Sequence, residues 1–293
     1  MRPATLPLLA CALALLAGCG EKGDAETGED ASLARAGLKE AVTSGLKEAG
    51  FKAEQGFGLQ VRVEQGLNWM DVLLDQPFRV YRQDRSKRAE LVSQVVRETR
   101  TRFRRGISGL SFADASDDLL PVLKPRFRLR TLDEDPVWTP FSADLAVLYA
   151  VQREHDFTIV SQVDAERWGR PPSELYGIAV GNLLRQTNRD EKLLCEPSGG
   201  EELCGWASGD GYDATRMIVP GLRDQIERRY GEPAVYAVPM ENVFVALPLR
   251  LARRKSTEKL LRTKVERDFA TSETPVSPKL FVERSGKLVV FSA

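Results

Sequence analysis

The chain has 293 residues, of which 42% are hydrophobic and 29% are charged, and its 42 Lys and Arg balance 42 Asp and Glu. This composition is typical of a folded globular protein and excludes a disordered, collagen-like or multi-spanning membrane chain. A net charge of zero gives no general attraction to nucleic acid or to anionic membranes, so we expect no nucleic-acid partner.

The N-terminus has the pattern of an export signal followed by a tether. Arg2 precedes an apolar run over residues 6–17, which is shorter than the roughly 20 residues that a membrane span requires. The run ends in Leu-Ala-Gly before Cys19, which resembles the lipobox of bacterial lipoproteins. The resemblance implies a signal peptide over 1–18 and an acyl anchor on Cys19; the alternative is a plain signal peptide with an incidental cysteine. Residues 19–32 are small, polar and acidic, which predicts a flexible tether.

The residue after Cys19 bears on the choice of membrane. Gly20, rather than Asp, resembles the pattern that directs many Gram-negative lipoproteins to the outer membrane. We therefore expect a lipid-anchored cell-envelope protein on the outer membrane, facing the periplasm.

The body after the tether is predicted to repeat a β-hairpin followed by a helix. A first helix is expected over 31–50, where apolar residues follow helical spacing. Hairpins are predicted over 59–63 with 67–73, 145–151 with 157–160, 203–207 with 212–219, and 235–238 with 243–247. Helices are predicted after them over 86–105, 171–186, 220–230 and 256–269, and a last hairpin over 279–284 with 287–291.

These elements predict an α+β fold. A short strand over 119–123 contains Pro121, which restricts it to a sheet edge or a strand end. Successive hairpins favour antiparallel pairing, so we expect repeated β-hairpin-then-helix units that form a two-layer, mostly antiparallel sheet with helices on one face. A single domain is expected over 33–293; two subdomains that meet near residue 140 are the alternative.

Two of the four cysteines are available to the exported body. Cys11 lies in the signal peptide, whereas Cys195 and Cys204 are predicted to form a disulfide, because thiols outside the cytoplasm usually pair. Residues 196–200, which read EPSGG, form a turn sequence that can bring the two together. A redox pair would favour a closer spacing, and no histidine lies near enough in sequence to complete a zinc site.

One segment resembles a known family. Residues 209–216 read Gly-Asp-Gly-Tyr-Asp-Ala-Thr-Arg, and Val-Tyr-Ala-Val-Pro at 235–239 and Asn-Val-Phe-Val at 242–245 follow. Together they resemble the bacterial family called domain of unknown function 1444, over about residues 55 to 290. The resemblance implies one compact domain and brings no established activity, substrate or catalytic residue. The export signal departs from the family pattern, so a role that depends on cytoplasmic partners does not transfer.

The same segment holds the densest group of polar side chains, Asp210, Tyr212, Asp213 and Arg216. A guanidinium offers a planar fork of donors, and carboxylates accept from amines or hydroxyls, so the group is a candidate binding site for a polar ligand. The alternative is a structural turn, in which Asp accepts backbone N–H groups and Arg216 pairs with a neighbouring carboxylate. A calcium loop needs ligands at alternate positions and a closing Glu, so we expect no metal.

The usual catalytic motifs are missing from the sequence. His155 is the only histidine and lies at the tip of a predicted hairpin, which is a poor support for a general base. The sequence contains no phosphate-binding loop and no dinucleotide fingerprint, so we expect no cofactor. The arginines of the helix over 86–105 are interpreted as a solvated face rather than as a phosphate site.

We therefore expect a non-catalytic envelope lipoprotein that binds an unidentified protein or a polar small molecule. The alternative is an envelope hydrolase that acts through acidic residues. That alternative requires carboxylates that converge in a concave pocket, at least one of them with a strongly raised pKa.

Overall fold

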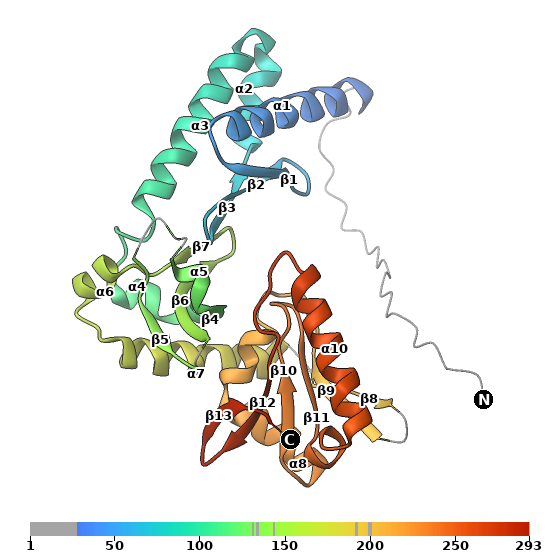
Figure 1. Ribbon diagram of the computed structural model, residues 1–293. Coiled ribbons are helices and arrows are strands. Elements are labelled where there is room, and N and C mark those ends of the chain that lie inside the picture. The colour runs from blue at the N-terminus through green and yellow to red at the C-terminus, as the bar shows by residue number, and fades with distance from the viewer. Residues whose placement is uncertain are drawn as a thin grey trace.

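The computed structural model describes residues 28–130, 132, 135–142, 144–190, 193–198 and 201–292 (Figure 1). The predicted signal peptide and Cys19 lie outside the described residues. The end of the predicted tether does not: residues 28–32 belong to helix α1 (Gly28–Glu48), so the helix begins earlier than expected.

The first of two sheets is formed by the N-terminal half of the chain. Its strands are β1 (Lys52–Gln55), β2 (Gln60–Gln65), β3 (Asn68–Leu73), β4 (Leu119–Pro125), β5 (Trp138–Pro140), β6 (Leu145–Arg153) and β7 (Asp156–Ile159). They lie in the order β1-β2-β3-β7-β6-β4, and β5 pairs with β6 beside β7. β4, which contains Pro121, is an edge strand as predicted, because proline cannot donate a hydrogen bond to a second neighbour.

The second sheet is formed by the C-terminal part. Its strands are β8 (Leu194–Ser198), β9 (Glu201–Trp206), β10 (Ala234–Ala237), β11 (Phe244–Pro248), β12 (Leu280–Arg284) and β13 (Lys287–Val290). They lie in the order β13-β12-β10-β11-β9-β8. All the strand pairs among the described residues are antiparallel, which confirms the predicted α+β class with antiparallel sheets.

Helices connect and cover the strands. The connections of the first sheet contain α2 (Asp75–Gln83), α3 (Arg88–Arg105), α4 (Phe112–Ala115) and α5 (Arg126–Leu129), with short 3-10 turns η1 (Arg85–Lys87) and η2 (Ser116–Asp118). α6 (Gln162–Trp168) and α7 (Pro172–Asp190) lead from the first sheet to the second. The second sheet is joined by η3 (Ala214–Ile218), α8 (Pro220–Tyr230), α9 (Leu249–Ala252) and α10 (Lys255–Thr271).

The N-terminal helices cover one face of β1 to β3. Alternation along β2 turns Val61 and Val63 toward the helices, where both are fully buried. They pack in one apolar cluster with Leu38 and Leu46 of α1 and with Leu91 of α3. The opposite face of these strands therefore carries the intervening polar residues of β2.

A single large core joins the two sheets. Residues 145–151 of β6 are all buried, and α7 packs on β4 with Leu175, Ala179 and Leu183. The same cluster includes Tyr236 and Phe244 of the second sheet together with apolar residues of α8. The two sheets thus share apolar packing rather than forming two separate cores.

The second sheet is covered on both faces. Val235 and Ala237 of β10 pack with α9 and α10 in a separate cluster, while Tyr236 faces the shared core. A strand that is apolar at consecutive positions is typical of a sheet buried on both sides. The prediction of helices on one face is therefore wrong for this sheet.

Most of the predicted elements are present, but one predicted hairpin is wrong. Residues 203–207 and 212–219 do not pair with each other: β9 pairs with β8 and β11, and η3 occupies 214–218. This stretch is buried on all sides, so its apolar residues do not mark a strand. α7 leads from the first sheet to the second, and residue 140, the predicted meeting point of subdomains, lies at the end of β5 within the first sheet.

Candidate functional site

The four residues singled out in the sequence form a compact, mutually bonded turn. Arg216 and Asp213 are completely buried and Tyr212 is nearly so. The Arg216 guanidinium lies 2.9 Å from Asp213 Oδ1 through Nη1 and 2.6 Å from Asp210 Oδ2 through Nη2. Asp210 also accepts a hydrogen bond from the Tyr212 N–H at 2.8 Å. The polar atoms of the group are thus engaged with one another.

The turn also bonds to four other parts of the fold. The contacts are Tyr212 Oη with Gln152 of β6, Arg216 Nε to Thr187 of α7, the Leu123 N–H of β4 to Thr215 Oγ1, and the Gly211 N–H to Asn242 Oδ1. These contacts tie the first sheet, α7 and the β10–β11 loop together. The geometry matches the structural alternative, in which the carboxylates and Arg216 close a turn.

The ionisation of this group follows from its contacts. Burial alone would raise the pKa of Asp210, but hydrogen bonds from Arg216 and from the Tyr212 N–H, together with the Arg216 charge, hold that pKa below its ordinary value. Burial raises the pKa of Tyr212, and the nearby Asp210 charge adds to the effect. The turn therefore holds an ionised carboxylate and a neutral phenol, which suits an ion pair rather than a proton acceptor.

A charged cleft of about 380 Å³ lies where the two sheets face each other. Its charged residues are Lys52, Glu64, Lys124, Arg128, Glu241 and Glu273, and Leu67, Trp69 and Pro275 supply apolar surface. The first sheet contributes one wall, and the loops around 241 and 274 contribute the other. Neither of these groups of residues forms a sequence motif, and the sequence alone did not indicate them.

Strand alternation explains the wall from the first sheet. Because Val61 and Val63 face the helices, Arg62 and Glu64 project from the opposite face of β2. Cross-strand pairing sets Glu64 opposite both Lys52 and Trp69. Lys52 Nζ lies 3.0 Å from Glu64 Oε2, and the Arg62 guanidinium stacks over the Trp69 ring at 3.7 Å. This face is thus a row of paired charges beside an indole.

The second wall is held by the buried turn. Glu241 lies in the β10–β11 loop. Its carbonyl accepts the Ala214 N–H at 2.9 Å, and its N–H donates to the Thr274 carbonyl at 3.2 Å. Its carboxylate bonds to Lys124 at the end of β4, which joins the two walls directly. The turn over 209–216 therefore positions the cleft without lining it.

The two walls also interact through charge. The pKa of Lys52 is raised, chiefly by its hydrogen bond and attraction to Glu64, with smaller contributions from Glu54 and from Glu273 across the cleft. Glu273 belongs to the segment after α10, so it faces Lys52 from the other sheet's side. The wall from the first sheet thus carries both signs of charge, whereas the facing loops carry the carboxylates of Glu241 and Glu273.

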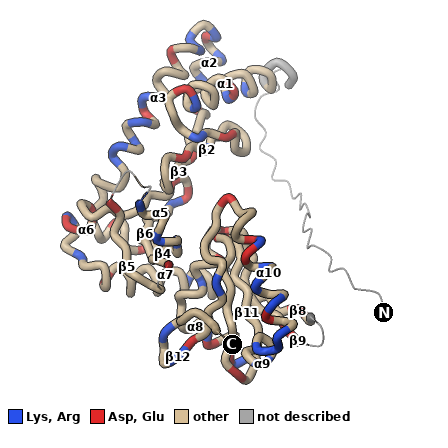
Figure 2. The backbone as a smooth tube through the Cα atoms, viewed as in Figure 1, with Lys and Arg blue, Asp and Glu red and all other residues tan. Residues whose placement is uncertain are grey.

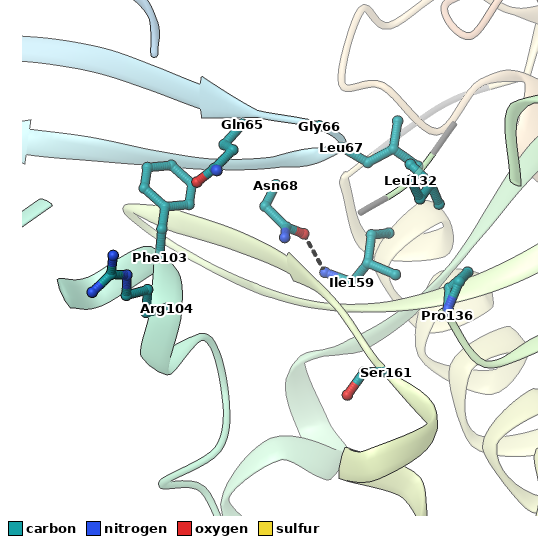
Figure 3. A pocket seen from close by; sticks show the side chains of 10 residues that line it. All are labelled: Gln65, Gly66, Leu67, Asn68, Phe103, Arg104, Leu132, Pro136, Ile159 and Ser161. Carbon is teal, nitrogen blue, oxygen red and sulfur yellow. Dashed lines mark hydrogen bonds between the residues drawn. The ribbon is translucent and has the colours of Figure 1, made fainter. Parts of the chain in front are cut away.

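A smaller cavity of about 130 Å³ lies on the other side of the β2–β3 turn (Figure 3). Gly66, Leu67 and Asn68 line both spaces. Asn68 Oδ1 accepts the Ile159 N–H at 2.8 Å, which fixes the turn to β7. Ser161 lines the far side of this cavity, and its hydroxyl caps α6 by bonding to the Asp164 N–H. The polar side chains of Asn68 and Ser161 are therefore used for hydrogen bonds within the fold, and the cavity lies beside a structural turn.

His155 lies at the tip of the β6–β7 hairpin, as predicted. Its carbonyl accepts the Asp71 N–H at 2.8 Å. Its ring nitrogens lie 3.9 Å from Asp71 Oδ2 and 3.7 Å from Glu154 Oε1. The ring therefore faces carboxylates rather than a nucleophile, and Asp71 is itself paired with Arg62.

Cys195 and Cys204 form the predicted disulfide, at directly paired positions of β8 and β9. Glu202 lies close to both sulfur atoms, and among the described residues these three are the group near enough to share an ion. The sulfurs are bonded to each other, however, and Glu202 binds Arg229 at 2.6 Å through each of its carboxylate oxygens. The arrangement is that of a cross-linked hairpin at a sheet edge.

Three carboxyl groups have pKa values that depart clearly from the ordinary ones. Within the described residues, the resolved carboxyl pKa shifts belong to Asp84, Glu202 and Asp210, and all three are downward. The hydrogen bond from Ser86 lowers the pKa of Asp84, and the bond from Arg229 lowers that of Glu202. A hydrolytic general acid needs the opposite shift.

The arginines of α3 are spread along its length, and Figure 2 shows them as a row of blue segments. Leu91, Val95, Thr99 and Phe103 form the buried stripe that the sequence predicted. Among the described helices, none is long and apolar enough to cross a membrane.

Comparison with known proteins gives no relative for this chain: no family model, curated protein or solved structure matches it. The resemblance of residues 209–216 to domain of unknown function 1444 therefore stays a prediction from the motif.

Proposed function

We propose that the protein is an outer-membrane lipoprotein, anchored through Cys19, whose body binds a charged peptide segment of a partner protein in the cleft between the two sheets. Binding, rather than catalysis, is the proposed activity. The observation that carries the proposal is the charge of the cleft. Lys52 and Glu64 pair on the wall from the first sheet, Glu241 and Glu273 make the other wall acidic, and Leu67, Trp69 and Pro275 supply apolar surface.

The composition of the cleft selects the ligand class. A polyanion would meet Glu64, Glu241 and Glu273, and a polycation would meet Lys52 and Lys124. A chain that carries both charges can direct its basic side chains to Glu241 and Glu273 and its acidic side chains to the lysines of the first wall. Trp69 offers a flat apolar surface for a further side chain. Nucleic acid is disfavoured on the same ground.

The envelope location is supported by the lipobox-like sequence and by the disulfide. A disulfide such as Cys195–Cys204 forms and persists in oxidising compartments, which include the bacterial periplasm. In this proposal the turn over 209–216 holds Glu241 in place, through the hydrogen bond from the Ala214 N–H to the Glu241 carbonyl, and does not contact the ligand.

Site-specific photocrosslinking in intact cells tests the proposed binding. A photoreactive residue at Thr274, which is exposed at the cleft, should give a discrete adduct with a protein, and Glu273→Lys should reduce its yield. The matched control is Val163 on α6, which is exposed but lies outside the cleft. Equal adducts at Thr274 and Val163, or none at Thr274, would overturn the binding proposal.

Mass spectrometry of the mature N-terminus tests the anchor separately. We expect the chain to begin at Cys19 with acyl groups attached, and Cys19→Ser to release it into the soluble periplasmic fraction. An unmodified full-length chain in the cytosol would contradict the anchor.

A further inference from the structure

Phe57, at the tip of the β1–β2 hairpin, is 93% exposed, more than any other large apolar side chain among the described residues. Single exposed apolar side chains are common on soluble proteins, so the exposure of Phe57 identifies no partner by itself. The support of the hairpin tip, the charge beside it and its distance from the anchor indicate what the ring can contact.

The tip is held firmly rather than frayed. Lys39 of α1 donates its ammonium to the carbonyls of Gly56 and Gly58, the latter at 2.9 Å, on either side of Phe57. The Gly56 N–H donates to the Gln60 carbonyl at 3.0 Å and closes the loop. Gly58 has a φ of +56°, a conformation that glycine adopts without strain. Hydrogen bonds from Lys39 and within the loop therefore hold the segment that carries Phe57 in place.

The support also places a cation at the loop that carries Phe57. The Lys39 ammonium lies at the base of the tip, because it bonds to the carbonyls on both sides of Phe57. A lysine just behind an apolar side chain is the arrangement in which the ring enters the acyl region of a lipid surface while the cation stays among the phosphates.

The hairpin lies at the end of the molecule from which the chain leads to Cys19. β1 and β2 pack against α1, and Figure 1 shows the hairpin tip on the same side as the first turns of that helix. Nine residue steps separate Cys19 from Gly28, and an extended chain of that length spans at most about 30 Å. A lipid on Cys19 therefore keeps this end of the body close to the membrane surface.

We propose that Phe57 inserts into the phospholipid surface that carries the Cys19 anchor, so that the hairpin tip is a second membrane contact. This inference rests on the proposed anchor and goes beyond it, since it fixes which end of the body faces the lipid. Insertion of one ring is weak by itself, but the anchor makes the contact intramolecular and raises its effective concentration. The contact then limits how the body, and the cleft with it, rotates on its tether.

Spin labelling of the intact mature protein tests the contact. Phe57→Cys leaves one free thiol when Cys19 is acylated and Cys195–Cys204 is closed, and the lipidated chain is reconstituted into phosphatidylethanolamine and phosphatidylglycerol vesicles. The matched control is Leu260→Cys on α10, where the side chain is 70% exposed in the other half of the molecule. Far-ultraviolet circular dichroism checks that both variants fold.

We expect the label at position 57 to lose collisions with a water-soluble nickel chelate and to gain collisions with oxygen when vesicles are present, while the label at 260 stays aqueous. Acylation is verified by mass spectrometry before reconstitution. A lipidated chain whose label at 57 is as aqueous as the label at 260 would overturn this proposal alone. An unacylated Cys19 would overturn the anchor and this inference together.

Discussion

Arg216 and Asp213 face each other with both side chains fully removed from solvent, and Nη1 of the one lies 2.9 Å from Oδ1 of the other. Asp213 also accepts hydrogen bonds from the Ser208 hydroxyl at 2.8 Å and from the Gly209 N–H at 3.0 Å. A buried charge is tolerated when it is paired and its remaining lone pairs are satisfied, and both conditions hold here. The most distinctive segment of the sequence is therefore an internal joint between the two sheets.

Arg216→Met should destabilise the protein strongly, because it leaves Asp213 buried without a countercharge. Removing one partner of a buried pair costs about 3–5 kcal/mol, which urea-induced unfolding would report as a lower midpoint. Arg229→Gln is the control, because Arg229 pairs with Glu202 at the surface, and its midpoint should not change. An unchanged midpoint for Arg216→Met would instead favour Asp210, Tyr212, Asp213 and Arg216 as a binding contact.

Asp210 should make stability depend on pH in the acid range. Its folded pKa lies below the ordinary value of 3.8, so its contribution is fully present above that value and is lost as the pH falls through the folded pKa. The excess stability of the wild type over Asp210→Asn should therefore shrink as the pH falls below 3.8. Unfolding free energies of the two proteins, measured across this range, check the direction. A constant difference would mean that Asp210 does not ionise as the contacts require.

The sequence predicted the helices and most hairpins correctly, because their signal is local. Buried residues alternate with more exposed ones along β2, and they recur every four positions along α3. Both patterns arise because each element buries one face. The prediction was wrong for the segment over 212–219, which is buried on every side. Its backbone makes local hydrogen bonds around Asp213 and Arg216 in place of the cross-strand hydrogen bonds of a hairpin. A strand and a fully buried 3-10 turn have the same apolar composition.

The cleft could not be predicted for a different reason. Lys124 and Glu241 are separated by 116 intervening residues and meet only because two sheets pack together. Isolated charges of this kind are frequent in the chain, and nothing in their immediate neighbours distinguishes them from solvated surface.

Gly205→Ala should unfold the edge of the second sheet. A Cβ at this position would lie 2.0 Å from the Phe244 carbonyl oxygen on the paired strand, so β9 and β11 would have to separate. Gly177→Ala is the matched control, because a Cβ there meets nothing within 4 Å on the exposed side of α7. It should raise stability by about 0.5–1 kcal/mol, since alanine is the better helix former. Thermal unfolding should show a lower melting temperature for Gly205→Ala and a higher one for Gly177→Ala. Equal changes in the two variants would contradict the close approach of β9 and β11 at Gly205.

Opening the disulfide should weaken the same edge. Cys195→Ala with Cys204→Ala removes a cross-link over a sequence separation of nine residues. The chain-entropy model assigns such a loop about 2–3 kcal/mol. Hydrogen exchange should increase first in β8 and β9, while the shared core around Tyr236 stays protected. Uniform loss of protection would show that the hairpin is cooperative with the whole sheet.

Lys124 and Glu241 should behave as an energetic link between the two sheets. Their side chains are 11% and 22% exposed, and they bond directly across the cleft. Lys124→Glu places two carboxylates together, Glu241→Lys places two ammonium groups together, and the double reversal restores an attractive pair. Contacting residues of this kind show coupling of about 0.5–3 kcal/mol in double-mutant cycles. Urea unfolding of the four proteins yields that coupling. Photocrosslinking at Thr274 in the double reversal then separates two roles of the pair. If both stability and the crosslinked adduct return, the ion pair acts by setting the distance between the walls that the ligand requires. If stability returns without the adduct, the position of each charge contributes to ligand binding. Additive effects, with no recovery in the double variant, would mean that this ion pair does not help to hold the two sheets together.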